Sequence, residues 1–163
     1  MRQWHAIGIF CEDIREEARS LHTLLGIMPD RMKVTKIPGG FSKLGMYVRV
    51  HVPVETDVGA IDVTIRLPDE TESTLAGFTV DQVKEEQQKA RENGMLHAGF
   101  IMQLVGAGIP IKQAGRLDLV VSVGGDKCVC GSLRIFQDEA TSSATASGRQ
   151  TLQFQPVAPE SSS

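Results

Sequence analysis

The chain has 163 residues, a length typical of one domain, and its 17 basic and 20 acidic side chains leave a formal net charge of −3. Without a basic surplus we do not expect it to bind nucleic acid, and its first residues lack the charged start and apolar run of a signal peptide. No segment has the roughly 18 consecutive apolar residues that span a bilayer. Three cysteines are too few, and odd in number, for a disulfide framework. We therefore expect a soluble cytoplasmic protein with no nucleic-acid or membrane partner.

The N-terminal segment predicts a hairpin. Residues 4–11 are apolar on both faces, which is typical of a central strand covered on both sides. The charged residues 12–17 continue this strand, 18–20 form a turn, and 21–28 return as a second strand. A helix over 12–25 is the alternative, because Glu and Arg favour helices.

Two segments alternate between apolar and polar residues, as strands with one buried face do. In 43–52 the expected inward side chains are Leu44, Met46, Val48, Val50 and Val52. In 60–67 they are Ile61, Val63, Ile65 and Leu67.

One segment, 79–93, has helix signals. Thr79 and Gln82 have the spacing of a capping box, and Gly94 stands where a glycine commonly ends a helix. A helix with so narrow an apolar stripe is expected on the surface. The stripe consists of Val80, Val83 and Ala90.

The remaining apolar segments predict further strands. They are 31–37, 95–105, 117–123 and 128–136, with glycine-rich breakers at 38–40 and 106–108. Eight or nine short strands about ten residues apart, with one polar helix, favour a mainly β fold. We predict an antiparallel β-sandwich, immunoglobulin-like or C2-like, over 1–138.

The C-terminal region has a different composition. Residues 139–147 are rich in Ala, Ser and Thr and have the character of a linker. An alternating segment at 150–156 is a candidate edge strand, and the chain then ends in a tail of disordered character.

Cys128 and Cys130 share one predicted strand, and their chemistry depends on its register. A tetrahedral zinc site needs four ligands, and no second close pair of cysteines exists. A three-residue loop at 124–126 favours the register that places Val121 opposite Val129. Leu117 then faces Leu133, and the cysteines lie on the opposite face, beside Ser122 and Val120. We interpret both as small apolar strand residues; a metal protein built on them is the weakest alternative.

No pattern indicates a cofactor or metal. The histidines occur singly at positions 5, 22, 51 and 97, without metal-ligand spacing, on the polar side of predicted strands. We interpret them as solvated or locally bonded; a metal site assembled from distant strands is the alternative. The glycines at 106–108 precede no helix that could hold a phosphate, and no nucleophile motif is present.

Charged residues cluster in the N-terminal hairpin. In an extended strand Asp13 and Arg15 share a face, so they can pair with each other or with a neighbouring strand. With Glu16 they are the candidates for a ligand site or a structural ion pair. A catalytic pair of carboxylates needs a set separation across a cleft, which one sequence does not define.

The hairpin sequence resembles that of a known family. Cys11-Glu12-Asp13-Ile14-Arg15-Glu16, followed by Leu24-Leu25-Gly26-Ile27, is similar to the opening of an uncharacterised family of small bacterial and phage proteins. Those proteins open with a Cys–acid–Asp–Ile/Val–Arg–x–Glu strand, a glycine turn and a Leu–x–Gly–Ile/Val strand. This chain departs from the pattern at 18–20, where glycines are expected. The resemblance implies a hairpin and carries no activity.

Two classes of function follow from this reading. The first is a non-enzymatic binding or assembly module that contacts a protein partner or a second copy of itself through sheet edges. The alternative is a small hydrolase or a ligand-sequestering protein with a site around Asp13, Arg15 and Glu16, since a fold alone does not exclude catalysis.

Overall fold

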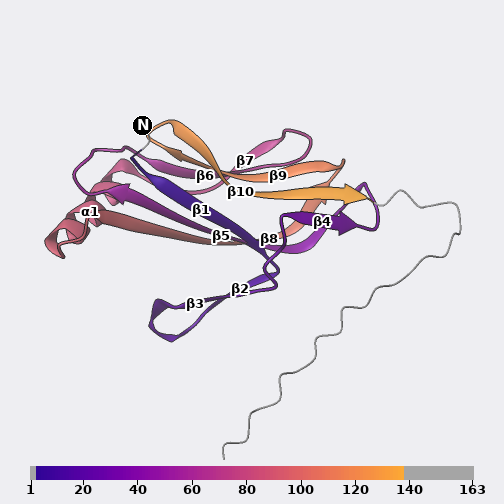
Figure 1. Ribbon diagram of the computed structural model, residues 1–163, viewed down its shortest axis with the longest axis horizontal. Coiled ribbons are helices and arrows are strands. Elements are labelled where there is room, and N and C mark those ends of the chain that lie inside the picture. The colour runs from indigo at the N-terminus through magenta and orange to yellow at the C-terminus, as the bar shows by residue number, and fades with distance from the viewer. Residues whose placement is uncertain (1–2, 138–163) are drawn as a thin grey trace, which may run out of the picture.

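Eight of the ten described strands form two β-sheets that pack face to face, and the other two form a separate hairpin (Figure 1). The computed structural model describes residues 3–137. The three-stranded sheet has the order β1 (His5–Cys11), β5 (Gly39–Pro53), β8 (His97–Ile111). The five-stranded sheet has the order β4 (Arg31–Val34), β10 (Asp126–Gln137), β9 (Gly115–Val123), β6 (Ile61–Arg66), β7 (Glu72–Phe78). The mainly β fold with several antiparallel pairs is confirmed, whereas the immunoglobulin-like or C2-like type stays a prediction.

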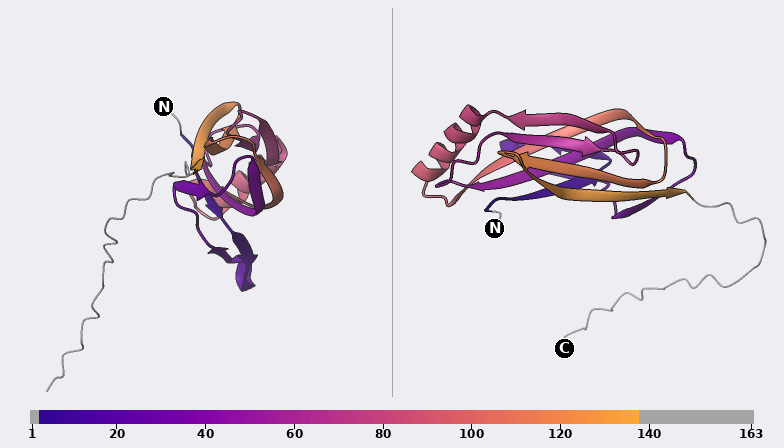
Figure 2. Two further views of the ribbon diagram at one scale, coloured as in Figure 1. Left: turned by 90° about the vertical axis from the view of Figure 1, so that its right-hand side faces the viewer. Right: turned by 90° about the horizontal axis from the view of Figure 1, so that it is seen from above.

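Two smaller elements stand at the ends of the three-stranded sheet. The hairpin of β2 (Asp13–Glu16) and β3 (His22–Leu25) extends from the side that faces away from the five-stranded sheet (Figure 1). Helix α1 (Val80–Glu92) covers the opposite end of the elongated molecule (Figure 2). Residues 138–163, including the predicted linker, edge strand and tail, lie outside the described residues.

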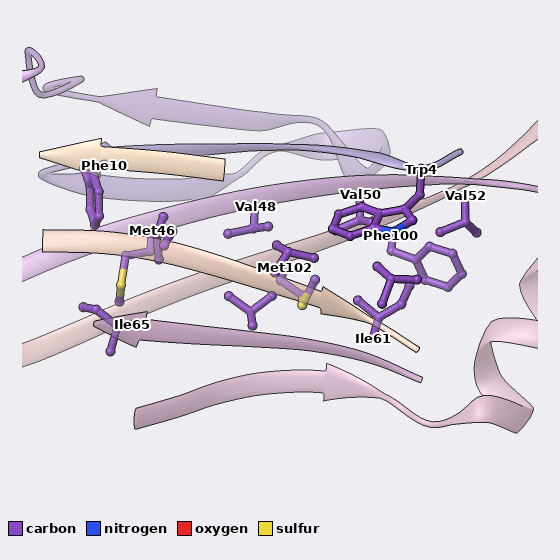
Figure 3. Packing of buried hydrophobic residues seen from close by; sticks show 14 of the residues in the cluster. Trp4, Phe10, Met46, Val48, Val50, Val52, Ile61, Ile65, Phe100 and Met102 are labelled. Atoms are coloured by element: carbon purple, nitrogen blue, oxygen red, sulfur yellow. The ribbon is translucent and has the colours of Figure 1, made fainter. Parts of the chain in front are cut away.

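The core consists of the inward side chains of both sheets. The predicted inward set of β5 is buried throughout, and Ile61, Val63 and Ile65 of β6 lie opposite it. Trp4, Val52 and Phe100 gather at one end of the core, and Phe10, Met46 and Ile65 gather at the other (Figure 3). Both strands predicted from strict alternation are therefore confirmed, because a period of two puts one face against the opposite sheet.

Helix α1 has the predicted caps. The Thr79 hydroxyl accepts from the Gln82 amide, the Gln82 side chain accepts from the Thr79 amide, and Gly94 adopts a φ of 68° after the last turn. Val83 and Ala90 are buried as expected, but Val80 is exposed, which corrects the predicted stripe. The helix is anchored instead by a polar residue, Gln87.

Gln87 was not predicted to be buried, yet only 5% of it is exposed. Its amide nitrogen donates to the carbonyl oxygens of Pro53 at 2.6 Å and Thr56 at 2.7 Å. Because these bonds satisfy a carbonyl at the end of β5 and one in the loop that follows it, they fix the helix against the end of the sheet.

The N-terminal hairpin is confirmed over the helical alternative. Ile14 pairs with Leu24 and Arg15 with Thr23 in an antiparallel register. Arg19 and Ser20 adopt positive φ angles of 65° and 56°, the conformation in which side chains are disfavoured. This turn therefore places two non-glycine residues in a conformation that favours glycine.

Several predicted elements are corrected by pairing between distant strands. β1 is an edge strand, with Ile7 55% exposed, and not a central strand covered on both sides. β7 was not predicted, and β4 runs parallel to β10 although every strand was expected to be antiparallel. β9 is the strand with both faces buried, from Leu117 to Val121.

The third strand of the smaller sheet, β8, is longer and less buried than expected. It runs through the glycines at 106–108, because Gly106 and Ala107 pair with β5 and the pairing resumes at Ile109 after Gly108, so this segment is not a breaker. Its side chains alternate between buried and exposed, whereas the mostly apolar composition of 95–105 favoured a buried strand. Ala98, Phe100 and Met102 face the core, and Ile101 and Val105 face outward.

The turn between β9 and β10 has two residues, not three. Asp126 pairs with Val123, and Gly124 and Gly125 between them both have positive φ, as the tight turns of hairpins require. A β-bulge between Val129 and Gly131 then shifts the register by one.

Because the bulge shifts the register by one residue, the predicted pairing holds beyond it although the turn is one residue shorter than predicted. Leu117 does face Leu133, but Cys128 faces Val121, and Val129 faces Val120. The predicted Val121–Val129 pair is therefore wrong.

The bulge lies where β1 approaches β10. A β-carbon on Gly131 would lie 2.5 Å from the Gly8 carbonyl oxygen, and one on Gly8 would lie 2.8 Å from the Cys130 sulfur. Only glycines allow the two backbones to come this close, so one side of the sandwich is closed by this contact.

We predict that Gly131→Ala lowers the free energy of unfolding by roughly 1–3 kcal/mol, because the new methyl group must displace the backbone of β1. Urea denaturation followed by tryptophan fluorescence measures the change. Gly99→Ala is the matched control, since the nearest atom to its β-carbon is 3.9 Å away. Equal stability of the two variants would contradict the close-contact argument.

Candidate functional site

The predicted hairpin residues form ion pairs on β2. Asp13 Oδ1 lies 2.6 Å from Lys43 Nζ, and Asp13 Oδ2 lies 3.9 Å from Arg15 Nε. The hydrogen bond from Lys43 is the main cause that lowers the pKa of Asp13. Arg15 and Glu16 are exposed, and Glu16 pairs with His22 through the β2–β3 register. The geometry of Asp13 is that of a salt bridge between the hairpin and β5.

The cysteines lie on the core side of their strand, which corrects the predicted face. Cys128 and Cys130 pack against the hydrophobic core, and the Cys130 thiol donates to the Leu119 carbonyl oxygen at 3.4 Å. Burial raises the pKa of Cys130 to about 12 and also raises that of Cys11. Thiols held in the protonated form are poor nucleophiles and poor metal ligands.

The outward side of the three-stranded sheet, which we call the outer face, presents histidines, an arginine and exposed aliphatic side chains. Its residues are those that alternate with the buried set, arranged in rows by the strand register. The rows are His5–His51–Gly99, Ile7–Arg49–Ile101 and Ile9–Tyr47–Gln103, ordered from β1 to β8. The sequence pattern had assigned Tyr47, Arg49 and His51 to the polar side of their strand, but nothing in it joined them to Ile7 and Ile101.

Three histidines that are distant in sequence meet at one end of the outer face. The rings of His5 and His51 stack with centroids 4.7 Å apart and planes 5° apart, and the His97 ring lies edge-on to His5 at 6.1 Å. Burial, the nearby Arg49 and the other two imidazoles lower the pKa of His51. Parallel stacked rings do not aim their nitrogens at one point, so this arrangement is not a ligand set.

Arg49 occupies the middle of the outer face between Ile7 and Ile101. Its side chain is exposed and makes no ion pair with another residue of the described chain. Ile7 is 55% exposed and Ile101 is 39% exposed. Arginine is enriched where proteins bind other proteins, and the two aliphatic side chains beside Arg49 add exposed apolar area to the same row.

The outer face is bounded at both ends. On the hairpin side, His22 is hydrogen-bonded to Gln103 and its ring lies 6.0 Å from that of Tyr47. On the helix side, a groove of about 440 Å³ separates α1 from β8. Arg49, Lys89, Met95 and Ile101 are among the residues that line it. The face is thus open between the hairpin and the helix.

A second polar cluster lies on the outward side of the five-stranded sheet. Asp118 is 2% exposed and accepts hydrogen bonds from Arg66 at 2.8 Å, Arg116 at 2.7 Å and Ser132 at 2.6 Å. Burial alone would raise the pKa of Asp118, but these bonds outweigh it and hold the pKa at about 2. Every oxygen of this carboxylate is engaged, so the cluster stabilises the fold and leaves no free group for catalysis.

Other kinds of site are absent from the part of the chain that the structure describes. Residues 3–137 contain no group of three or more His, Cys, Asp or Glu side chains that could hold a metal ion. Within the same residues, no helix has the length and apolar character needed to cross a bilayer.

Comparison with known proteins places the chain in a family. A family model described as "Family of unknown function (DUF6941)" matches residues 6–136, which include nearly all of the two sheets. The chain belongs to this family. Its members have no established function, in agreement with the resemblance to an uncharacterised family. No curated protein and no solved structure matches the chain.

We predict that Asp118→Asn lowers the free energy of unfolding by about 2 kcal/mol near neutral pH, because the charge on the bound carboxylate is lost. The pKa of Asp118 is about 2 in the folded protein and ordinarily near 3.8. This stabilisation is therefore complete above pH 4 and disappears as the pH falls from about 4 to 2.

Urea denaturation at a series of pH values measures this difference, with the exposed Asp62→Asn as the control on the adjacent strand. A gap between wild type and Asp118→Asn that stays constant down to pH 2 would contradict the assigned role of the carboxylate.

Proposed function

We propose that this protein is a non-enzymatic binding module whose outer face contacts a protein partner. The observation that carries the proposal is the row Ile7–Arg49–Ile101, which is exposed in the middle of a sheet whose other side is buried in the core. Exposing large apolar side chains to water is unfavourable, and a bound partner that covers Ile7 and Ile101 would remove this cost.

The architecture supports a docking role for this face. β5 is the middle strand of its sheet and is held on both sides by backbone pairing, so Arg49 projects from a rigid support. A rigid strand keeps its side chains in place before binding, which reduces the entropy lost on association. The hairpin and α1 limit how a partner can approach.

The setting of this function is also part of the proposal. We propose an intracellular location, supported by an odd number of cysteines and by the partly buried Cys130 thiol, whose raised pKa keeps it protonated. A bacterial or phage origin is supported by the resemblance of the hairpin sequence alone. A second copy of the chain is the alternative occupant of the outer face.

The test compares two exposed apolar residues on opposite sheets. Ile101 lies on the outer face and Val129 lies on the five-stranded sheet, with exposures of 39% and 44%. We expect tagged wild-type protein and Val129→Glu to capture the same partner from cells, and Ile101→Glu to lose it by about tenfold or more, as hot-spot substitutions do. Circular dichroism checks that each variant is folded.

Equal capture by all three proteins would contradict the proposal. So would a hydrolytic activity of the wild type that Asp13→Asn abolishes without loss of stability, because this result would assign the function to the hairpin. Sedimentation of the purified chain shows whether Ile101→Glu instead dissociates a dimer.

A further inference from the structure

We infer that the outer face binds an acidic segment of another protein, with a carboxylate on Arg49 and aliphatic side chains on Ile7 and Ile101. The inference rests on the proposed function and adds the chemistry of the partner. It requires a face of one charge sign, a cation without a partner, and apolar contacts on both sides of that cation.

The charge on the outer face has one sign. Its rows contain no Asp or Glu, and Arg49 is their permanently charged residue. The groove beside α1 has one acidic residue among the described residues that line it, Glu86, which already lies 2.8 Å from Lys89. A guanidinium covered by a partner must gain an anionic neighbour, because burying an unpaired charge is costly.

A carboxylate is the anion that fits the surroundings of Arg49. The planar guanidinium binds carboxylate groups through two parallel hydrogen bonds. The imidazoles of His5 and His51, in the adjacent row, supply further N–H donors on one side of such a group. Ile7 and Ile101 flank Arg49 in its own row, so a chain with aliphatic side chains next to the acid covers all three residues.

The same charge pattern argues against a second copy of this chain. A symmetric dimer places the same patch on both subunits, and any pairing of two outer faces sets Arg49 of each copy against a face without a carboxylate. Like charges brought together in an interface disfavour association. An acidic partner removes this repulsion, so it is the favoured occupant.

The test screens random short peptides, displayed on beads, for binding to the folded full-length chain. We expect the bound peptides to be enriched in Asp and Glu next to aliphatic residues. Their affinity should fall by about tenfold or more in Arg49→Met, because methionine retains an unbranched apolar chain like the aliphatic part of arginine but lacks the charge. Arg15→Met is the matched control, because Arg15 is an exposed arginine on the hairpin.

The pH dependence provides a readout that a purely structural role would not affect. The groups that act on His51 are Arg49 on its own strand, His5 on β1 and His97 on β8. Protonation of His51 adds positive charge beside the bound carboxylate, so peptide affinity should rise as the pH falls through the lowered pKa of His51. His51→Gln should reduce this rise.

Each outcome decides one of the two proposals. Peptides that are lost in Ile101→Glu but show no acidic enrichment would overturn this inference and leave the proposed function standing. Peptides unaffected by both Ile101→Glu and Arg49→Met would overturn both. A wild-type dimer that Ile101→Glu dissociates would make a second copy the occupant and overturn the acidic partner.

Discussion

Every second side chain of β5 is buried against the five-stranded sheet, and the rest of the structure depends on this alternation. The strand lies in the middle of its own sheet, so its inward residues from Leu44 to Val52 form the centre of the core. Its outward residues are then fixed by the same period of two. Tyr47, Arg49 and His51 are exposed because their neighbours in sequence are buried, and strand pairing places β1 and β8 beside them. Core packing and the composition of the outer face are therefore two results of one pattern.

The elements that could be predicted are those whose signals are local. Alternation in 43–52 and 60–67 and the caps around 79–93 each depend on neighbours within a few residues, so they survive in the folded protein. Pairing between distant strands could not be predicted in this way. The glycines at 106–108 break a strand when considered alone, but pairing with β5 on both sides of Gly108 continues the strand through them. The register of β9 and β10 depends on a bulge beside Gly131, and local turn signals do not show that β1 approaches there.

The candidate site shows the same division. Asp13, Arg15 and Glu16 are adjacent in sequence and were easily singled out, and Asp13 does pair with Arg15 and Lys43. The outer face is instead assembled from three strands that are far apart along the chain. His5 and His51 are cross-strand neighbours only because of the β1–β5 register, which places them directly opposite each other. Sequence reasoning put His51 on the polar side of its strand, but it treated the strand of His5 as covered on both faces and lacked the pairing that brings the two together.

The contact between Gly8 and Gly131 also has a consequence for the order in which the chain folds. It joins a strand near the beginning of the described chain to one near its end, and β5 must lie between β1 and β8 at the same time. During synthesis on a ribosome, β1 emerges early but contacts β10 only after β10 itself has been made. Contacts of such long sequence separation are formed late and slow the folding of all-β proteins. Before the β9–β10 hairpin emerges, β10 does not yet cover β1. The nascent chain therefore has its greatest tendency to aggregate at this stage.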